Sequence, residues 1–124
     1  MGGGSGSICR MAWSVDDLVA TLVASEESSY VRGVADWLVH GEVGLTPPAR
    51  SGERVVDALA AAAVAHLART QGQAPPAWTR AHDRLLDAFW HPSGDRFFAY
   101  SLAHAPAEFA ARGVIVEQDS LVSV

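Results

Sequence analysis

Apolar positions recur with helical spacing through the first half of the chain and predict three amphipathic helices. The segment "SVDDLVATLVASEES" is the first, because Ser14 is placed to cap it and aspartates occupy its first turn. The segment "SSYVRGVADWLVHG" is the second, with an apolar stripe that ends before Gly41. The third, "ERVVDALAAAAVAHLARTQG", ends at Gly72. Its predicted buried face comprises Val56, Leu59, Ala63 and Leu67.

Shorter elements, separated by proline and glycine, are predicted in the second half. A helix over "TRAHDRLLDAFW" would carry its apolar face on Trp78, His82, Leu85, Leu86 and Phe89. A further helix is expected at "RFFAYSLAH", and a short one at "PAEFAAR" between Pro106 and Gly113. The β-branched "VIV" that follows predicts a strand. A strand this short must pair, either within this chain or with a partner.

The expected fold is therefore mainly α: a small single-domain bundle of five or six helices with one short C-terminal β segment. The chain has 124 residues, which is the size of one domain. The opening "MGGGSGS" resembles a flexible linker, so residues 1–10 are expected to form a disordered, linker- or tag-derived leader. Residues 11–124 are expected to form the single helical domain.

Charge and cysteine content narrow the possible functions. The formal net charge is −5, with fourteen acidic side chains against nine basic ones, and this balance disfavours direct nucleic-acid binding. Cys9 is the sole cysteine, so no disulfide framework is possible. No apolar run reaches the roughly 20 residues of a membrane span. All nine basic residues are arginine, a bias typical of a GC-rich bacterial genome, and we expect a cytoplasmic protein without a membrane partner.

The sequence matches known catalytic motifs only weakly. His82 and Asp83 are adjacent and could belong to a metal site like that of the HD phosphohydrolases, although a histidine on an apolar helix face is usually structural. The zinc-protease helix, the phosphate-binding loop and the serine nucleophile elbow are missing from the sequence. We therefore expect no enzymatic activity, no catalytic residue, no cofactor and no metal.

Tryptophan is abundant for so small a domain, with indoles at positions 13, 37, 78 and 90. Core packing is the commoner role of each, but Trp78 and Trp90 stand beside proline-containing loops and near arginines, as the anchors of protein interfaces often do. The predicted partner-binding residues are Trp78, Arg80, Arg84, Trp90, Phe109, Arg112, Val114, Ile115, Val116 and Leu121.

The order of motifs over the last part of the chain resembles a known family. "HLA" at the end of a helix leads to "PAWT", then to "WHP", and finally to "APAEFAARGVIVEQDSL". This order is similar to that of small actinobacterial antitoxins encoded beside nucleotidyltransferase-fold toxins of the AbiEii/MenT kind. Some members carry a helix-turn-helix domain, and none is recognisable before the matched region here.

The resemblance implies an antitoxin of a type II toxin–antitoxin system. Such a protein neutralises its cognate nucleotidyltransferase toxin by direct protein–protein binding. Two alternatives remain open from the sequence: a metal-dependent HD-like phosphohydrolase, and a stand-alone helical regulatory or ligand-binding domain.

Overall fold

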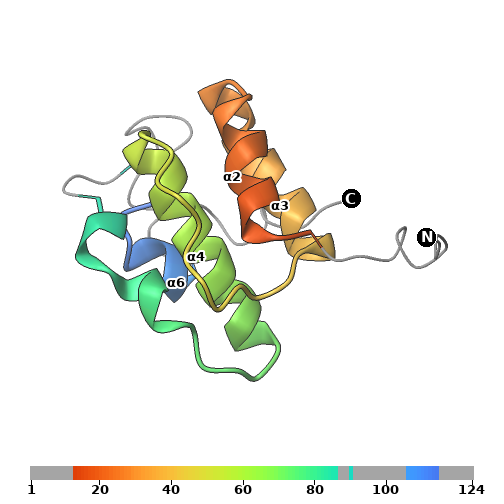
Figure 1. Ribbon diagram of the computed structural model, residues 1–124, viewed down its shortest axis with the longest axis vertical. Helices are drawn as coiled ribbons and strands as arrows, with labels where there is room; N and C mark the ends of the chain where they lie inside the picture. Colours follow the sequence, from red (N-terminus) through yellow and green to blue (C-terminus); the bar gives the residue numbers. More distant parts are fainter. Residues whose placement is uncertain (1–12, 87–89, 91–105, 115–124) are drawn as a thin grey trace, which may run out of the picture.

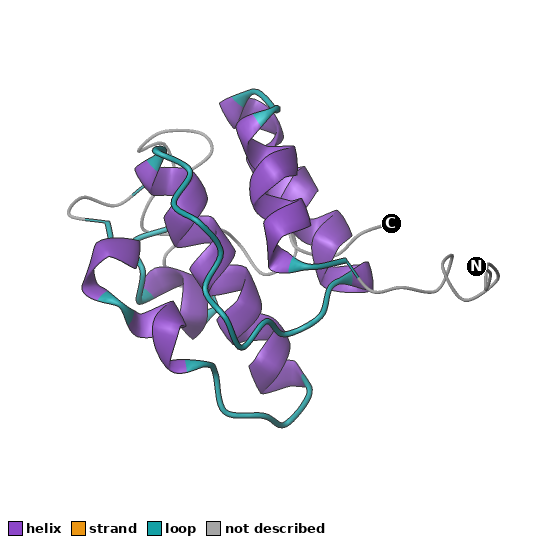
Figure 2. Cartoon of the chain, viewed as in Figure 1, coloured by secondary structure: helices purple, strands orange, loops and turns teal. Residues whose placement is uncertain are grey.

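The computed structural model describes residues 13–86, 90 and 106–114, and within them the chain is mainly helical (Figures 1 and 2). The α-helices of this part are α2 (Val15–Val23), α3 (Tyr30–His40), α4 (Arg54–Thr70) and α6 (Ala107–Ala110). Single turns of 3-10 helix are η1 (Glu27–Ser29), η2 (Ala77–Arg80) and η3 (His82–Arg84). The expected leader and the helix expected at "RFFAYSLAH" lie outside the described residues.

Helices α2 and α3 form a hairpin, and the predicted cap begins it. The Ser14 hydroxyl accepts a hydrogen bond from the Asp17 amide, and the Asp17 carboxylate accepts one from the Ser14 amide. This reciprocal capping box satisfies two amides that the first turn leaves without helical partners. The two helices approach closely at Gly33, where an added Cβ would lie 3.0 Å from a methyl of Leu22.

Helix α4 occupies the centre of the described structure and packs against α2, α3, α6, η2 and η3. Its predicted apolar face is confirmed, since Val56, Leu59, Ala63 and Leu67 are all buried. Burial extends almost around the helix because the run from Ala60 to Ala63 consists of alanine, whose single methyl lets neighbouring backbones approach from several sides. The chain leaves α4 through Gly72, where the helix was predicted to end, and its φ of +73° is a left-handed conformation that favours glycine.

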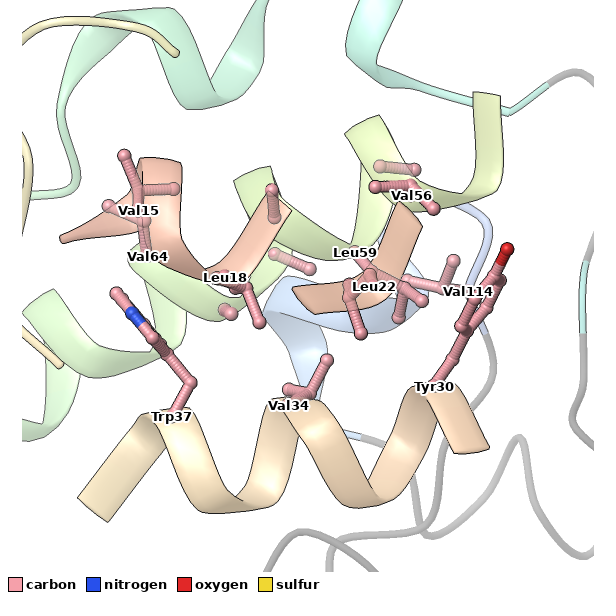
Figure 3. Close-up of a cluster of buried hydrophobic side chains, with 14 of the residues drawn as sticks. Val15, Leu18, Leu22, Tyr30, Val34, Trp37, Val56, Leu59, Val64 and Val114 are labelled. Atoms are coloured by element: carbon pink, nitrogen blue, oxygen red, sulfur yellow. The ribbon is translucent and has the colours of Figure 1, made fainter. Parts of the chain in front are cut away.

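The core lies where the hairpin meets α4 (Figure 3). One stripe of α3 faces the other two helices, with Tyr30, Val34 and Trp37 on successive turns. Leu18 and Leu22 of α2 fill the space between that stripe and α4. The apolar stripe predicted for α3 is thus confirmed, and that of α2 is confirmed except at its end, where Val23 is exposed. Burial of these side chains is the main force that folds this part of the chain.

The single helix predicted over "TRAHDRLLDAFW" is wrong in its described part. Two separate 3-10 turns replace it, and Ala81 between them is extended, with ψ of 140°. Long-range hydrogen bonds hold the backbone in this form: the Arg54 side chain donates to the Leu85 carbonyl over 2.8 Å, and the Leu86 amide donates to the Arg112 carbonyl over 3.1 Å. A helix through Leu85 and Leu86 would use these groups internally, so tertiary bonding overrides the helical periodicity.

A helix forms at "PAEFAAR" as predicted, but it is shorter: α6 covers only Ala107–Ala110, Pro106 occupies the N-cap position before it, and Gly113 follows with φ of +85°. Val114 forms an isolated parallel bridge with Trp90, and the Trp90 amide donates to the Gly113 carbonyl over 2.7 Å. The first residue of "VIV" therefore pairs within its own chain. Ile115, Val116 and Leu121 lie outside the described residues, where the predicted strand is untested.

Candidate functional site

A groove of about 420 Å³ lies on the α2–α3 hairpin, a volume within the roughly 300–1,000 Å³ of ordinary ligand pockets. We call it the acidic groove because two carboxylates and two indoles lie among its lining side chains. The lining residues are Trp13, Asp17, Leu18, Thr21, Gly33, Asp36 and Trp37. Every one of them belongs to the hairpin or to the residue that immediately precedes the α2 cap, so packing of α2 on α3 is sufficient to build the groove.

Trp13 is an exposed indole on a fixed backbone. Its side chain is 42% exposed, yet its amide donates to the His40 carbonyl over 2.9 Å and its carbonyl accepts from the Glu42 amide over 3.0 Å. The indole also contacts the His40 ring, with centroids 4.5 Å apart. A large, rigid, partly exposed aromatic side chain is a common energetic anchor of protein interfaces.

The inner wall of the acidic groove is the buried Trp37. This indole donates to the Ser14 carbonyl over 2.9 Å, so its ring links α3 to the cap of α2. Close packing at Gly41 fixes it further, since a Cβ added there would lie 2.6 Å from the Cδ2 and Cζ2 atoms of Trp37. The groove is thus shaped by side chains that have little freedom to move.

Negative charge is concentrated on the same hairpin. Residues 13–42 hold one arginine, Arg32, against six carboxylates, a formal charge of −5 that equals that of the whole chain. The six are Asp16, Asp17, Glu26, Glu27, Asp36 and Glu42. Apolar side chains of the hairpin are exposed too, including Val23 at the end of α2 and Val39 in the last turn of α3. The hairpin therefore combines an exposed aromatic side chain, exposed apolar side chains and a net negative charge.

Several predicted partner-binding residues lie in the interior of this chain. Phe109 and Val114 are fully buried and belong to the core, and Arg84 and Arg112 are 2% and 6% exposed. The structure brings them together around η2, η3 and α6, but as a packed interior. Arg80 alone among the described predicted residues is exposed.

Trp78 and Arg84 form a pair that fixes the η2–η3 segment. The Arg84 guanidinium lies over the Trp78 ring, 4.9 Å from its centroid, and donates to the Pro48 carbonyl over 2.9 Å. The Trp78 indole donates to the Gly44 carbonyl over 2.8 Å. Burial lowers the pKa of the Arg84 guanidinium below its usual range, although Asp57 opposes this shift. Both side chains therefore hold the loop after α3 against η2 and η3.

Arg112 anchors α6 to η2 through a buried fork of hydrogen bonds. Its guanidinium donates to the Thr79 carbonyl over 2.7 Å, to the Glu108 carbonyl over 2.8 Å and to the Thr79 hydroxyl over 3.3 Å. Burial lowers the pKa of this guanidinium below its usual range, Glu108 opposes the shift, and Arg80 reinforces it.

Glu108 is a buried carboxylate with two cationic neighbours on α4. His66 Nδ1 lies 2.7 Å from its Oε1, and Arg69 forms an ion pair with its Oε2. Burial by itself raises the pKa of the Glu108 carboxyl, but the hydrogen bonds from these two side chains outweigh burial and bring the pKa below 4.5. The ionised carboxylate ties α6 to α4.

Trp90 is half-buried and joins the C-terminal bridge to the hairpin. Its indole donates to the Glu27 carboxylate, and its ring lies 6.1 Å from that of Tyr30. Burial raises the pKa of the Tyr30 hydroxyl, and Glu53 and Glu27 raise it further. Trp90 therefore links η1, through its indole, to Val114, through its backbone.

The sequence prediction missed the acidic groove because it placed the interface tryptophans at positions 78 and 90. One local signal was present: Trp13 directly precedes the helix cap and Leu18 is the fourth helical residue, which is the spacing of a hydrophobic staple. That spacing indicates that Trp13 lies beside Leu18. It does not reveal Asp36, which approaches α2 only through the packing of α3.

The aspartate of the histidine–aspartate pair considered for metal binding is paired with an arginine. Asp83 forms an ion pair with Arg50 on the protein surface. His66 is committed to Glu108, and His40 contacts Trp13. Within residues 13–86, 90 and 106–114, no three histidine, cysteine, aspartate or glutamate side chains are grouped so that they could hold a metal ion.

Comparisons with protein-family models, with curated proteins and with solved structures gave no match. In the described part of the chain, every helix falls short of the length and apolar character that crossing a membrane requires.

Proposed function

We propose that this chain is a protein-binding domain that acts as an antitoxin, and that it neutralises a nucleotidyltransferase-fold toxin by direct contact through the α2–α3 hairpin. The observation that carries the proposal is the composition of that hairpin. It holds a formal charge of −5 and carries the 42% exposed Trp13.

Electrostatic complementarity is the physical reason for the choice of partner. An enzyme that handles nucleotide triphosphates or RNA needs a basic cleft to attract phosphate. A folded domain with concentrated carboxylates on one face is steered toward such a cleft, and its association rate rises as ionic strength falls. Exposed apolar side chains, Val23 and Val39 among them, supply the short-range contact that charge alone does not.

The proposal is tested by co-expressing the chain with the product of the neighbouring gene. We expect relief of growth arrest and co-purification of a stable complex. Neutralising the hairpin with Asp16→Asn, Glu26→Gln and Glu42→Gln together is expected to slow association about tenfold at low salt. Glu53→Gln is the matched control, because Glu53 is an exposed carboxylate outside the hairpin. A pair that neither binds nor restores growth overturns the proposal.

A further inference from the structure

Arg84 carries a buried hydrogen-bond donor whose acceptor is not a protein group. Among the residues that the structure describes, its Nη1 is the only buried side-chain nitrogen or oxygen without a hydrogen-bond partner. A buried polar group is almost always bonded to protein or to ordered water, because an unpaired one keeps the full cost of losing its hydration. Arg112 shows the ordinary case, since its buried guanidinium donates through Nε, Nη1 and Nη2.

The direction of the Arg84 Nη1 group is fixed by contacts on the rest of the guanidinium. Nη2 donates to the Pro48 carbonyl over 2.9 Å, and the guanidinium carbon lies over the Trp78 ring, 4.9 Å from its centroid. A rotation that carried Nη1 toward another acceptor would move Nη2 away from the Pro48 carbonyl. The free donor is therefore held in place, as a binding site requires.

Asp57 is the buried carboxylate closest in effect to this donor. The residue is 4% exposed, and its Oδ1 accepts the Ser51 amide over 3.0 Å. Burial lowers the pKa of the Arg84 guanidinium, and among the charges around it that of Asp57 opposes the shift most. These two described side chains form no direct ion pair. Because a carboxylate accepts several hydrogen bonds, Asp57 has acceptor capacity left for a bridging molecule.

We propose that Arg84 Nη1 and Asp57 together bind one buried water molecule, which accepts from the guanidinium and donates to the carboxylate. Charge selects a neutral ligand, because the guanidinium repels a cation and the buried carboxylate repels an anion. Size selects a small one, because Arg84 and Asp57 are 2% and 4% exposed. Water is the small neutral molecule that both accepts and donates, and it commonly joins buried polar groups in this way.

This water couples two points at which the loop between α3 and α4 is attached. Arg84 of η3 holds the Pro48 carbonyl, and Asp57 of α4 holds the Ser51 amide. A water bonded to both side chains fixes this part of the loop to η3 and α4 together. Since a water-mediated bond is nearly as favourable in enthalpy as a direct one, the bridge takes the place of the missing ion pair. The site is independent of the antitoxin role.

The test is an NMR experiment on the unaltered full chain with ¹⁵N-labelled arginine. At the water frequency, the Nη protons of Arg84 are expected to show NOE and ROE cross-peaks of opposite sign, which identify a water molecule that tumbles with the protein. Arg112 is the internal control and is expected to show none, because its donors are bonded to protein. Absence of the Arg84 cross-peaks, or equal ones at Arg112, would overturn the inference.

Added salts distinguish water from an adventitious anion. Replacing chloride with bromide or phosphate is expected to leave the Arg84 side-chain resonances in place. A saturable shift of these resonances with either anion shows that the ligand is charged, and it refutes the bridging water.

Two matched variants test the role of the carboxylate. Asp57→Asn keeps the side-chain shape but is expected to weaken the Arg84–water NOE about twofold, because a charged acceptor binds roughly twice as strongly as a neutral one. Asp83→Asn removes a carboxylate beside Arg84 that lies on the surface in an ion pair with Arg50, and it is expected to leave the NOE unchanged. If Asp57→Asn has no effect, or if both variants have the same effect, Asp57 does not bind the water and the proposed bridge is wrong.

Discussion

Replacing Arg112 with lysine is expected to destabilise the fold strongly although it conserves the charge. The guanidinium makes three hydrogen bonds, two to Thr79 and one to the Glu108 carbonyl, in a site that leaves 6% of the residue exposed. A lysine ammonium is a compact group that cannot reach acceptors spread across the guanidinium fork. At least one buried carbonyl therefore loses its charged donor.

The size of the effect follows from those bonds. A hydrogen bond to a charged group contributes about 1.5–3 kcal/mol, so loss of one or two amounts to about 3 kcal/mol. Small domains have a total stability of roughly 5–15 kcal/mol, which makes this a large fraction. With a urea dependence of about 1–3 kcal/mol per molar, the unfolding midpoint is expected to fall by between about 1 and 3 M.

Urea unfolding followed by tryptophan fluorescence measures this shift, with Arg80→Lys as the matched control. Arg80 is an exposed arginine on the same segment, and its replacement is expected to leave the midpoint unchanged. If Arg112→Lys moves the midpoint no further than Arg80→Lys does, the buried fork does not hold α6 to η2. If Arg112→Lys instead weakens partner binding and leaves the stability unchanged, Arg112 contacts the partner, as the sequence predicted.

Three further measurements test other parts of the fold. The folded-state pKa of the Glu108 carboxyl lies below 4.5, so the ionised carboxylate contributes its full stabilisation above that pH. The free energy of unfolding should then fall as the pH drops through the folded-state pKa, and Glu108→Gln should make it less dependent on pH in that range. Gly41→Ala places a methyl against the Trp37 ring and should cost about 1–3 kcal/mol, seen as a lower thermal midpoint. Leu22→Ala should cost about 2–5 kcal/mol in urea unfolding, whereas Val23→Ala, at a half-exposed neighbour, should cost far less.

The helices that could be predicted are those whose signals are local. Ser14 caps α2, Gly72 follows α4, and Pro106 and Gly113 bracket α6, each within a few residues of the element it delimits. Apolar periodicity then identified the buried faces of the first three helices. Capping and periodicity act through neighbours in sequence, so the sequence itself displays them.

The region around residues 79–86 could not be predicted for the opposite reason. Its leucines have helical spacing, but its backbone is bonded to Arg54 and Arg112, which are distant in sequence. The prediction that Arg84 and Arg112 lie at an interface failed for the same reason. The local sequence around Trp78 and Arg84 does not distinguish a buried arginine stacked on a tryptophan from the same two side chains exposed on the surface. The acidic groove likewise depends on how α2 crosses α3, which neither helix specifies alone.

The alanine run in α4 restricts how the sequence of this chain can evolve. Around much of that helix the only side-chain atom is a methyl, so the separation between the hairpin and the C-terminal elements is set by backbone thickness. Any larger residue there would push neighbours apart on several sides at once. The outward surfaces of α2 and α3 carry no such restriction. The central helix and the hairpin surface that we propose to bind the partner are therefore free to diverge at different rates, so that substitutions on the hairpin need not disturb the packing around α4.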